Sequence, residues 1–448
     1  MLRVDRRIAG VLALLPSQAV VGVIAACGQA ADRPAELPTA PPPPSAHVEF
    51  LASGALSGRG YLHGGQAVAA RYIREHFVRA SLTPAGNDYF QPFGITPDHF
   101  PSEPQLEING RKLALGTDFV PIVGSPSATV ADARTHAVGH GITRESPRID
   151  DFAVFPPGAA AIVESGLPDS IDAASLPAGA LRVDAKAVRA ADAGASCLIE
   201  VVDRLIYDIS TDDIPIPAFR VLRTALPPHD EVERISCRVE TRRNVLTEVA
   251  NVAGVVSGTD PAAPAVLLSA HYDHLGGIGD SLFFPGANDN ASGVALLLDL
   301  AYHYAINPPR RTLVFAAFAA EELGLLGARY FVAYPRYPLE SIGLVLNFDM
   351  VASGEDGIVV SGGSDHPDLF GKLEAVASST GAGPIRARAT TPISDHYPFS
   401  VAGVPAFYLY TSGGLQPYHH VNDHPGTLEW DDYLVVRELV VAFIDELD

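Results

Sequence analysis

Downstream of Asn251 the chain alternates between short apolar stretches and helical patterns, and this alternation limits the available folds more than any other feature. Residues 265–270 are almost wholly apolar, as is typical of a strand that is buried on both faces. Residues 312–317 and 344–346 predict further strands, and residues 292–306 predict a helix that follows the first strand. The pattern predicts an α/β fold: a mixed, twisted sheet with helices on both of its faces.

Each predicted strand is followed by a side chain that can bind a metal ion. Ligands of such sheets gather at the carboxyl ends of the strands, so we expect these side chains to meet at one edge of the sheet. Two imidazoles and three carboxylates in one place suit two zinc ions. The candidate ligands are His271, Asp289, one of the Glu321-Glu322 pair, Asp349 and one of the His419-His420 pair.

The motifs around these positions resemble the cocatalytic zinc exopeptidases, a family that includes bacterial secreted aminopeptidases and glutamate carboxypeptidases. The resemblance runs from about residue 46 to the C-terminus and includes the early segment Leu56-Ser57-Gly58-Arg59-Gly60. An inserted region is similar, more weakly, to a protease-associated (PA) domain. The motifs that carry the resemblance are HYDHLGG (271–277), GANDNASG (286–293), AEELGLLG (320–327), NFDM (347–350), SDHYPF (394–399) and Tyr418-His419.

The resemblance implies how the ligands are divided between two zinc ions. His271 and Asp349 would hold one ion, and Glu322 and His419 would hold the other. Asp289 would bridge the two ions, and the peptide bond that follows it would be cis. Two zinc ions lower the pKa of a shared water and polarise the carbonyl group of a peptide bond.

The same resemblance implies catalytic roles for neighbouring residues. Glu321 would be the general base, since a carboxylate that is bound to zinc would lose most of its basicity. Asp273 would hydrogen-bond the ring of His271 and so orient it. Tyr418 would donate a hydrogen bond to the developing oxyanion. His396 is expected to line the substrate pocket.

The implied function is that of an exopeptidase, and we expect an aminopeptidase that releases N-terminal residues from peptide substrates. A carboxypeptidase of the glutamate-carboxypeptidase type uses the same metals and remains an alternative. A glutaminyl cyclase shares the fold but generally uses one zinc ion, and receptor-like relatives keep the fold but lose ligands. The complete set of five ligands argues against both of these. Residue preference, peptide length and oligomeric state stay open.

The formal net charge of −21 restricts the partners. Nucleic acids and anionic membrane surfaces are polyanions, so we expect the chain to bind neither. A surplus of acidic residues is usually a solvated surface and identifies no substrate.

The first residues resemble an export signal of the lipoprotein type. Arg3, Arg6 and Arg7 precede an apolar stretch, which ends in Ile24-Ala25-Ala26-Cys27 and resembles a lipobox. We therefore expect residues 1–26 to be a signal peptide. The expected product is an exported bacterial protein, periplasmic or at the cell surface, whose one membrane attachment is a lipid on Cys27.

The rest of the chain divides into a linker and two folded parts. Residues 27–45 are rich in Ala and Pro and predict an extended linker. Residues 46–117 and 243–448 are expected to form the catalytic domain. Residues 118–242 predict an inserted, β-rich, PA-like module. Its histidines and acids have no ligand spacing, so we assign it no chemistry and expect it to wall the cleft.

Two cysteines lie inside the predicted module. Cys197 and Cys237 each belong to a short apolar, β-like run. Export permits a disulfide, but the sequence does not supply the distance between the two residues. A disulfide and two buried free thiols fit equally well.

Overall fold

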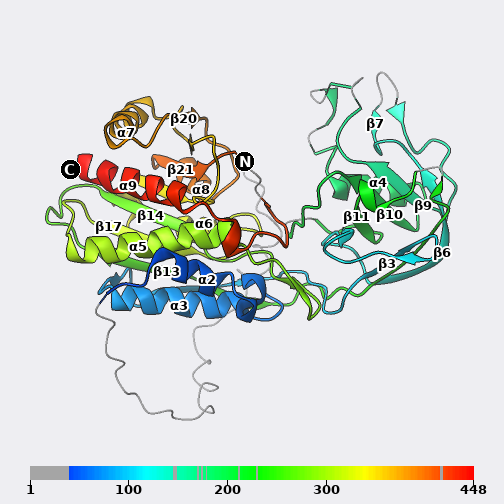
Figure 1. The fold of residues 1–448 in the computed structure, drawn as a ribbon, viewed down its shortest axis with the longest axis horizontal. Coiled ribbons are helices and arrows are strands. Elements are labelled where there is room, and N and C mark those ends of the chain that lie inside the picture. The colour runs from blue at the N-terminus through cyan, green and yellow to red at the C-terminus, as the bar shows by residue number, and fades with distance from the viewer. Residues whose placement is uncertain are drawn as a thin grey trace, which may run out of the picture.

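The computed structural model has two lobes, each built around a β-sheet (Figure 1). The predicted signal peptide and Cys27 lie outside the residues that the structure describes. None of the described helices is both long enough and apolar enough to cross a membrane. The described residues are 40–144, 149–168, 171–172, 175–177, 179–209, 212–228, 231–413 and 417–447.

The larger lobe contains a mixed sheet with nine strands among the described residues. Its four central strands, in the order β17-β14-β18-β21, are parallel, and antiparallel strands flank them on both sides. Every residue of β14 is buried, as its apolar composition predicts. The strands are β1 (Thr83–Pro84), β2 (Phe90–Ile95), β13 (Thr247–Val256), β14 (Ala265–His271), β17 (Leu313–Phe318), β18 (Ile342–Phe348), β19 (Ile358–Ser361), β20 (Ile385–Arg388) and β21 (Ala406–Thr411).

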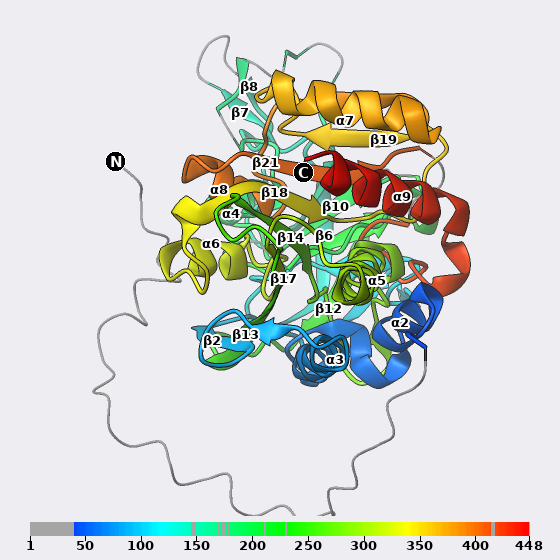
Figure 2. The same cartoon turned by 90° about the vertical axis from the view of Figure 1, so that its left-hand side faces the viewer.

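Helices cover both faces of this sheet (Figure 2), which confirms the predicted fold class. On one face α5 packs on the central strands and α3 packs on β13, and α2, α3 and α9 all contact α5. Because the sheet and these helices enclose α5, it is apolar around most of its circumference. Helices α6 and α8 pack on the opposite face. The helices of this lobe are α2 (Pro44–Leu51), α3 (Gly65–Arg79), α5 (Gly293–Ile306), α6 (Leu326–Ala333), α7 (Pro367–Thr380), α8 (His396–Val401) and α9 (Trp430–Glu446).

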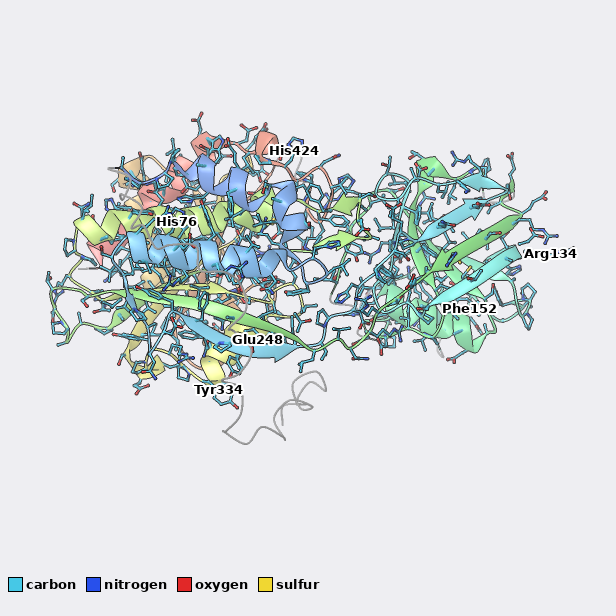
Figure 3. The ribbon with its side chains drawn as sticks, turned by 90° about the horizontal axis from the view of Figure 1, so that it is seen from below. His76, Arg134, Phe152, Glu248, Tyr334 and His424 are labelled. Carbon is cyan, nitrogen blue, oxygen red and sulfur yellow. The ribbon has the colours of Figure 1, made fainter. Side chains whose placement is uncertain are left out.

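The second lobe is the predicted β-rich module. Its sheet has eight strands among the described residues, in the order β4-β3-β12-β6-β9-β10-β11-β5, and α4 packs on β10. Figure 3 shows Arg134 and Phe152 on this lobe, and His76 and Tyr334 on the other. The elements are β3 (Gln105–Ile108), β4 (Arg111–Lys112), β5 (Phe119–Pro121), β6 (Ala128–Ala137), β9 (Ala160–Glu164), α4 (Val183–Asp192), β10 (Cys197–Val202), β11 (Ala218–Leu222) and β12 (Arg234–Val239).

The module begins earlier than the sequence predicts. Strand β3 pairs with β12, and β4 pairs with β3, so both belong to the module's sheet and not to the catalytic sheet. The expected boundary at residue 118 therefore moves to about Gln105. At the other end the chain returns to the larger sheet at β13, which begins at Thr247.

The remaining elements are short. Two small ribbons pair β7 with β8 and β15 with β16. Their bounds, and those of the 3-10 turns, are β7 (Thr143–Arg144), β8 (Ile149–Asp150), β15 (Gly277–Ile278), β16 (Leu282–Phe283), η1 (Gly54–Arg59), η3 (Arg223–Ala225), η6 (Leu339–Ser341) and η7 (Pro425–Thr427).

The two cysteines of the module are free thiols and both are buried. Cys197 and Cys237 therefore do not form a disulfide in this structure. A hydrogen bond with the Cys237 thiol, together with burial, raises the pKa of Cys197 well above its usual value. The two sulfur atoms are thus close neighbours in the core of the module.

Candidate metal centre

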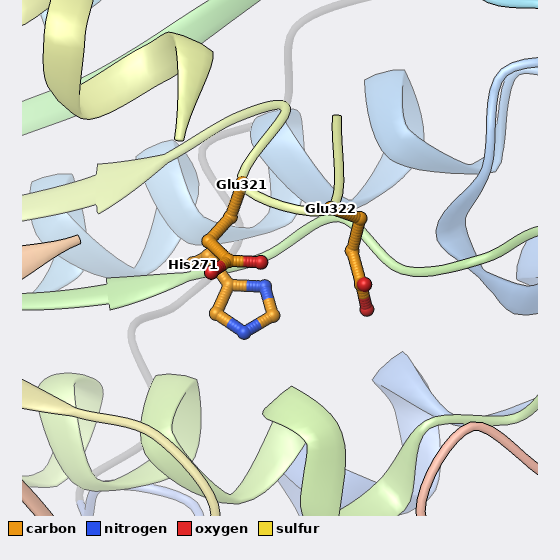
Figure 4. A group of neighbouring side chains, drawn as sticks. All are labelled: His271, Glu321 and Glu322. Atoms are coloured by element: carbon orange, nitrogen blue, oxygen red, sulfur yellow. The ribbon is translucent and has the colours of Figure 1, made fainter. Parts of the chain in front are cut away.

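The predicted ligands meet at one edge of the larger sheet. Strand β14 ends at His271, and its parallel neighbours β17 and β18 end just before the Glu321-Glu322 pair and Asp349. Because neighbouring parallel strands end at the same edge, the three segments deliver their side chains to one place. Figure 4 shows His271, Glu321 and Glu322 gathered there.

Two imidazoles approach the Asp289 carboxylate from different sides. His271 Nε2 lies 3.4 Å from Asp289 Oδ1 and 3.3 Å from Asp349 Oδ1. His419 Nε2 lies 3.3 Å from Asp289 Oδ2 and 3.1 Å from Glu322 Oε2. Each half of the site therefore contains one histidine, one carboxylate of its own and one oxygen of Asp289. The peptide bond after Asp289 is cis, as expected.

The donor set fits zinc. Two ligand atoms at about 2.0–2.1 Å from a tetrahedral zinc ion lie about 3.3 Å apart, close to the spacings within each half. All five side chains are buried. Buried carboxylates in such number are costly unless a cation or a hydrogen-bond donor compensates each charge. The five side chains can therefore hold metal in two adjoining places.

The adjacent carboxyl groups of Glu321 and Glu322 differ in their surroundings. Burial raises the pKa of Glu321 well above its usual value, and Asp395 is the strongest of the nearby charges that add to the effect. Burial also acts to raise the pKa of Glu322, but the charge of His419 and the hydrogen bonds with His274 and His419 together outweigh it and lower the pKa of Glu322 to about 2. Only Glu321 of the pair remains half-exposed. Neighbouring acids with opposite shifts are suited to different tasks.

Asp273 has a different contact from the expected one. Its Oδ1 lies 3.8 Å from His271 Nδ1, which is too long for a hydrogen bond. Instead, Oδ1 accepts the backbone N–H of Glu321 at 3.1 Å, and Oδ2 accepts the hydroxyl of Tyr61 at 2.7 Å. Asp273 therefore fixes the backbone that carries the two glutamates.

His396 and Tyr418 differ in their access to the site. His396 has no exposed surface, and its ring nitrogens lie 3.2 Å from Ser361 Oγ and 3.1 Å from the Ser394 carbonyl oxygen. The expectation that it lines a pocket is therefore wrong for this packing, because α8 turns the ring into the core. Tyr418 stacks on the His419 ring at 3.8 Å between centroids and stays 37% exposed.

Comparison with known proteins identifies the domain that contains this site. Residues 251–444 match the model of peptidase family M28. This part of the chain is a family M28 peptidase domain. The match begins in β13 and ends in α9, so it contains every predicted metal ligand.

Solved structures show that the fold extends beyond the M28 domain. A zinc aminopeptidase from Bacillus subtilis aligns with 92% of this chain and 96% of its own, with a TM-score of 0.71 and 22% identity. An aminopeptidase from Aneurinibacillus sp. strain AM-1 aligns with 90% of this chain and 92% of its own, with a TM-score of 0.64 and 22% identity. The alignment of nearly complete chains shows that both lobes follow a known arrangement.

Curated relatives match a shorter stretch. A vacuolar membrane protease of Candida albicans is 39% identical over 107 residues, which are 24% of this chain and 12% of that protein. A probable zinc metalloprotease of Pyricularia oryzae is 34% identical over 119 residues, 26% of this chain and 23% of that protein. The chain thus aligns with less than a quarter of the length of either relative.

These relatives also overturn the expected location. They are fungal proteins, and several are named vacuolar membrane proteases. The expectation of an exported bacterial protein that is held by a lipid on Cys27 is therefore wrong. It depended on the composition of residues 1–27 alone, and basic and apolar residues in that order do not specify a compartment.

The sequence analysis missed the contacts of Arg59, which braces the M28 domain from the N-terminal segment. Arg59 is fully buried, and all five of its N–H donors bind backbone carbonyls. One acceptor is the carbonyl of Tyr272, directly after His271. The motif of residues 56–60 marked Arg59 as a candidate functional residue. Its structural role could not be predicted, because it depends on contacts with residues far along the chain. The acceptors are Tyr272, Leu51, Pro285, Gly286 and Asp289, at 2.9, 2.9, 2.8, 2.7 and 3.2 Å.

Three more side chains orient ligands of the M28 domain. Ser394 donates to Asp349 Oδ2 at 2.7 Å. Asp423 accepts the backbone N–H groups of Asn288 and Asp289 at 2.9 and 3.0 Å. His274 Nδ1 lies 2.7 Å from a carboxylate oxygen of Glu322, which is shorter than the spacing of two ligands on one ion and fits a hydrogen bond. These contacts help to orient the Asp349 and Glu322 carboxylates and the backbone at Asp289.

Proposed function

We propose that the chain is a zinc-dependent aminopeptidase that uses two zinc ions. The observation that carries the proposal is the Asp289 carboxylate, whose two oxygens face two different histidines. A carboxylate in that position is suited to bridge two ions. Family M28 membership of residues 251–444 and the zinc aminopeptidase fold neighbours support the choice of zinc and of peptide substrates.

Five side chains would hold the two ions. His271 and Asp349 form one half of the site, Glu322 and His419 form the other, and Asp289 serves both. Zinc bound there would acidify a coordinated water and polarise the carbonyl of the peptide bond. The remaining work falls to residues that are not ligands.

Glu321 is placed to move protons. It is half-exposed beside His271, and burial favours its protonated form, so it can accept a proton from water and pass it to the leaving amine. The hydroxyl of Tyr418 can donate a hydrogen bond to the carbonyl oxygen as negative charge develops there. Burial and the charge of Asp289 raise the pKa of Tyr418 well above its usual value, which keeps the donor proton in place.

The contacts of Arg59 favour a peptide N-terminus over a C-terminus at this site. The carboxyl groups of Asp289, Glu322 and Asp273 all act on Arg59, which is buried among them. Arg59 cannot receive the carboxylate of a substrate, because backbone carbonyls occupy all five donors. An aminopeptidase is therefore the better fit than a carboxypeptidase.

A panel of blocked peptides tests the proposal. We expect cleavage of leucine anilides and of peptides with an amidated C-terminus, and no cleavage of the same peptides after N-acetylation. Release of C-terminal residues from N-acetylated peptides would instead identify a carboxypeptidase. Cyclisation of N-terminal glutamine without hydrolysis would identify a glutaminyl cyclase.

A further inference from the structure

The loop that carries His419 has an unusual backbone. His419 adopts a φ of +53°, in the left-handed region that residues other than glycine seldom occupy. Such a conformation costs about 1–3 kcal/mol and persists where neighbouring groups enforce it. The carbonyl of His419 must therefore be held in place by another part of the molecule.

The group that holds it comes from the inserted module. The backbone N–H of Tyr207 donates to the His419 carbonyl oxygen at 3.1 Å. Tyr207 lies between β10 and β11 of the module and is buried. Its ring stacks on Phe284 of the M28 domain with centroids 4.7 Å apart and planes within 7° of parallel. The ring contact and the backbone hydrogen bond fix Tyr207 to two segments beside the metal ligands.

A buried ion network anchors this segment to the core of the module. Arg220 of β11 donates to the carbonyl of Ile206 at 2.6 Å and to Glu200 at 3.2 Å. Glu200 also accepts Lys186 at 2.9 Å, and the Lys186 side chain is fully buried. Removing one member of a buried network is strongly destabilising, because it leaves the others unpaired. The module therefore presents the Tyr207 N–H from a rigid support.

We propose that the inserted module is a positioning element of the metal centre, acting on His419 through the Tyr207 backbone. The inference rests on the proposed function, in which His419 holds one of two zinc ions. It adds a second role to the expectation that the module walls the cleft. Since Tyr207 contacts the His419 loop and not His271 or Asp349, its loss should weaken the Glu322–His419 half of the site selectively.

Zinc titration of the metal-free, full-length chain tests this positioning role. A chromophoric chelator that competes for zinc measures the stoichiometry and both affinities without any activity assay. The main variant is Tyr207→Pro, which removes the N–H donor. We expect it to bind one zinc ion as the wild type does and the second at least tenfold more weakly. Tyr207→Phe keeps the N–H and the aromatic ring, so it should bind both zinc ions with wild-type affinity.

A second pair of variants tests the same role without proline, which could distort the backbone around residue 207. Arg220→Met frees the Ile206 carbonyl and should weaken the second zinc ion in the same way, by a smaller factor. Arg223→Met is the matched control, because Arg223 pairs with Glu164 and Asp203 within the module and makes exposed ion pairs. It should bind both ions as the wild type does.

The outcomes separate this inference from the proposed function. Two zinc ions of unchanged affinity in both Tyr207→Pro and Arg220→Met would overturn the positioning role and leave the aminopeptidase proposal intact. Equal loss of both ions in the two variants would also overturn it, because the effect would not be selective for His419. A wild-type chain that binds fewer than two ions would instead reject the proposed function.

Discussion

The carboxylate of Asp273 accepts the backbone N–H of Glu321 at 3.1 Å. This hydrogen bond ties the segment after β17 to the end of β14, where the proposed metal ligand His271 lies. The hydrogen bond therefore fixes the position of the Glu321 backbone, which carries the side chain that we propose as the base. Asp273 also accepts the backbone N–H of the neighbouring Glu322, at 3.4 Å, while the Glu322 carboxylate contacts His274 and His419.

Substitution of the two glutamates should separate proton transfer from metal binding. Glu321→Gln removes a base and no ligand, so it should keep its zinc and lose about 10²–10⁴-fold in kcat. Glu322→Gln should lose zinc from the half of the site that contains His419. Metal analysis and kinetics on both variants make the comparison. Equal loss of zinc in the two variants would show that the assignment of base and ligand is wrong.

Arg59 should be required to hold the backbone segments that carry His271 and Asp289 in position. Arg59→Lys keeps the charge but has three donors for five carbonyl acceptors, so some carbonyls lose their partner at about 1–3 kcal/mol each. We expect a lower urea midpoint and weaker zinc binding. Arg437→Lys is the control, since Arg437 is half-buried and pairs with Asp299 on the surface of α5. Similar zinc affinity in both variants would remove the proposed role of Arg59.

The convergence of the proposed metal ligands was predictable because most of them directly follow strands whose composition is unambiguous. The buried run of β14 leads into His271, and the apolar ends of β17 and β18 lead into Glu322 and Asp349. Local pattern was sufficient there, since parallel strands bring their carboxyl ends together without further information.

Contacts between distant segments were not predictable. Arg59 binds the carbonyl of Tyr272, 213 residues away, and that of Gly286, 227 residues away. Nothing in the residues themselves indicates which carbonyls come within reach. The module boundary was missed for a related reason: β3 and β4 have four and two residues, too few to show a period of their own. His396 was misplaced because its burial depends on how α8 is rotated.

Two buried histidines should make stability depend on pH. Burial lowers the pKa of His47 to about 3 and that of His76 to about 4. Their rings meet between α2 and α3, and each lies 2.8 Å from a tyrosine hydroxyl oxygen. As the pH falls below about 6.5, the unfolded chain takes up protons that the folded chain does not. The free energy of unfolding should therefore fall by about 1.4 kcal/mol per pH unit for each histidine, down to about pH 4.

Urea unfolding at pH 7 and pH 4.5 measures this dependence. The double variant His47→Gln/His76→Gln should have a flatter pH profile than the wild type. His424→Gln is the control, because His424 is exposed on the surface of the same lobe (Figure 3). Identical slopes in the wild type and the double variant would show that other groups cause the acid sensitivity.

Metal content alongside activity tests the central claim, that two halves of one site share Asp289. The full-length protein should contain close to two zinc ions per chain when fully active. Removal of zinc by a chelator should abolish cleavage of a leucine anilide, and return of two equivalents should restore it. A fully active protein with one zinc ion per chain, which gains nothing from a second equivalent, would contradict the two-ion account.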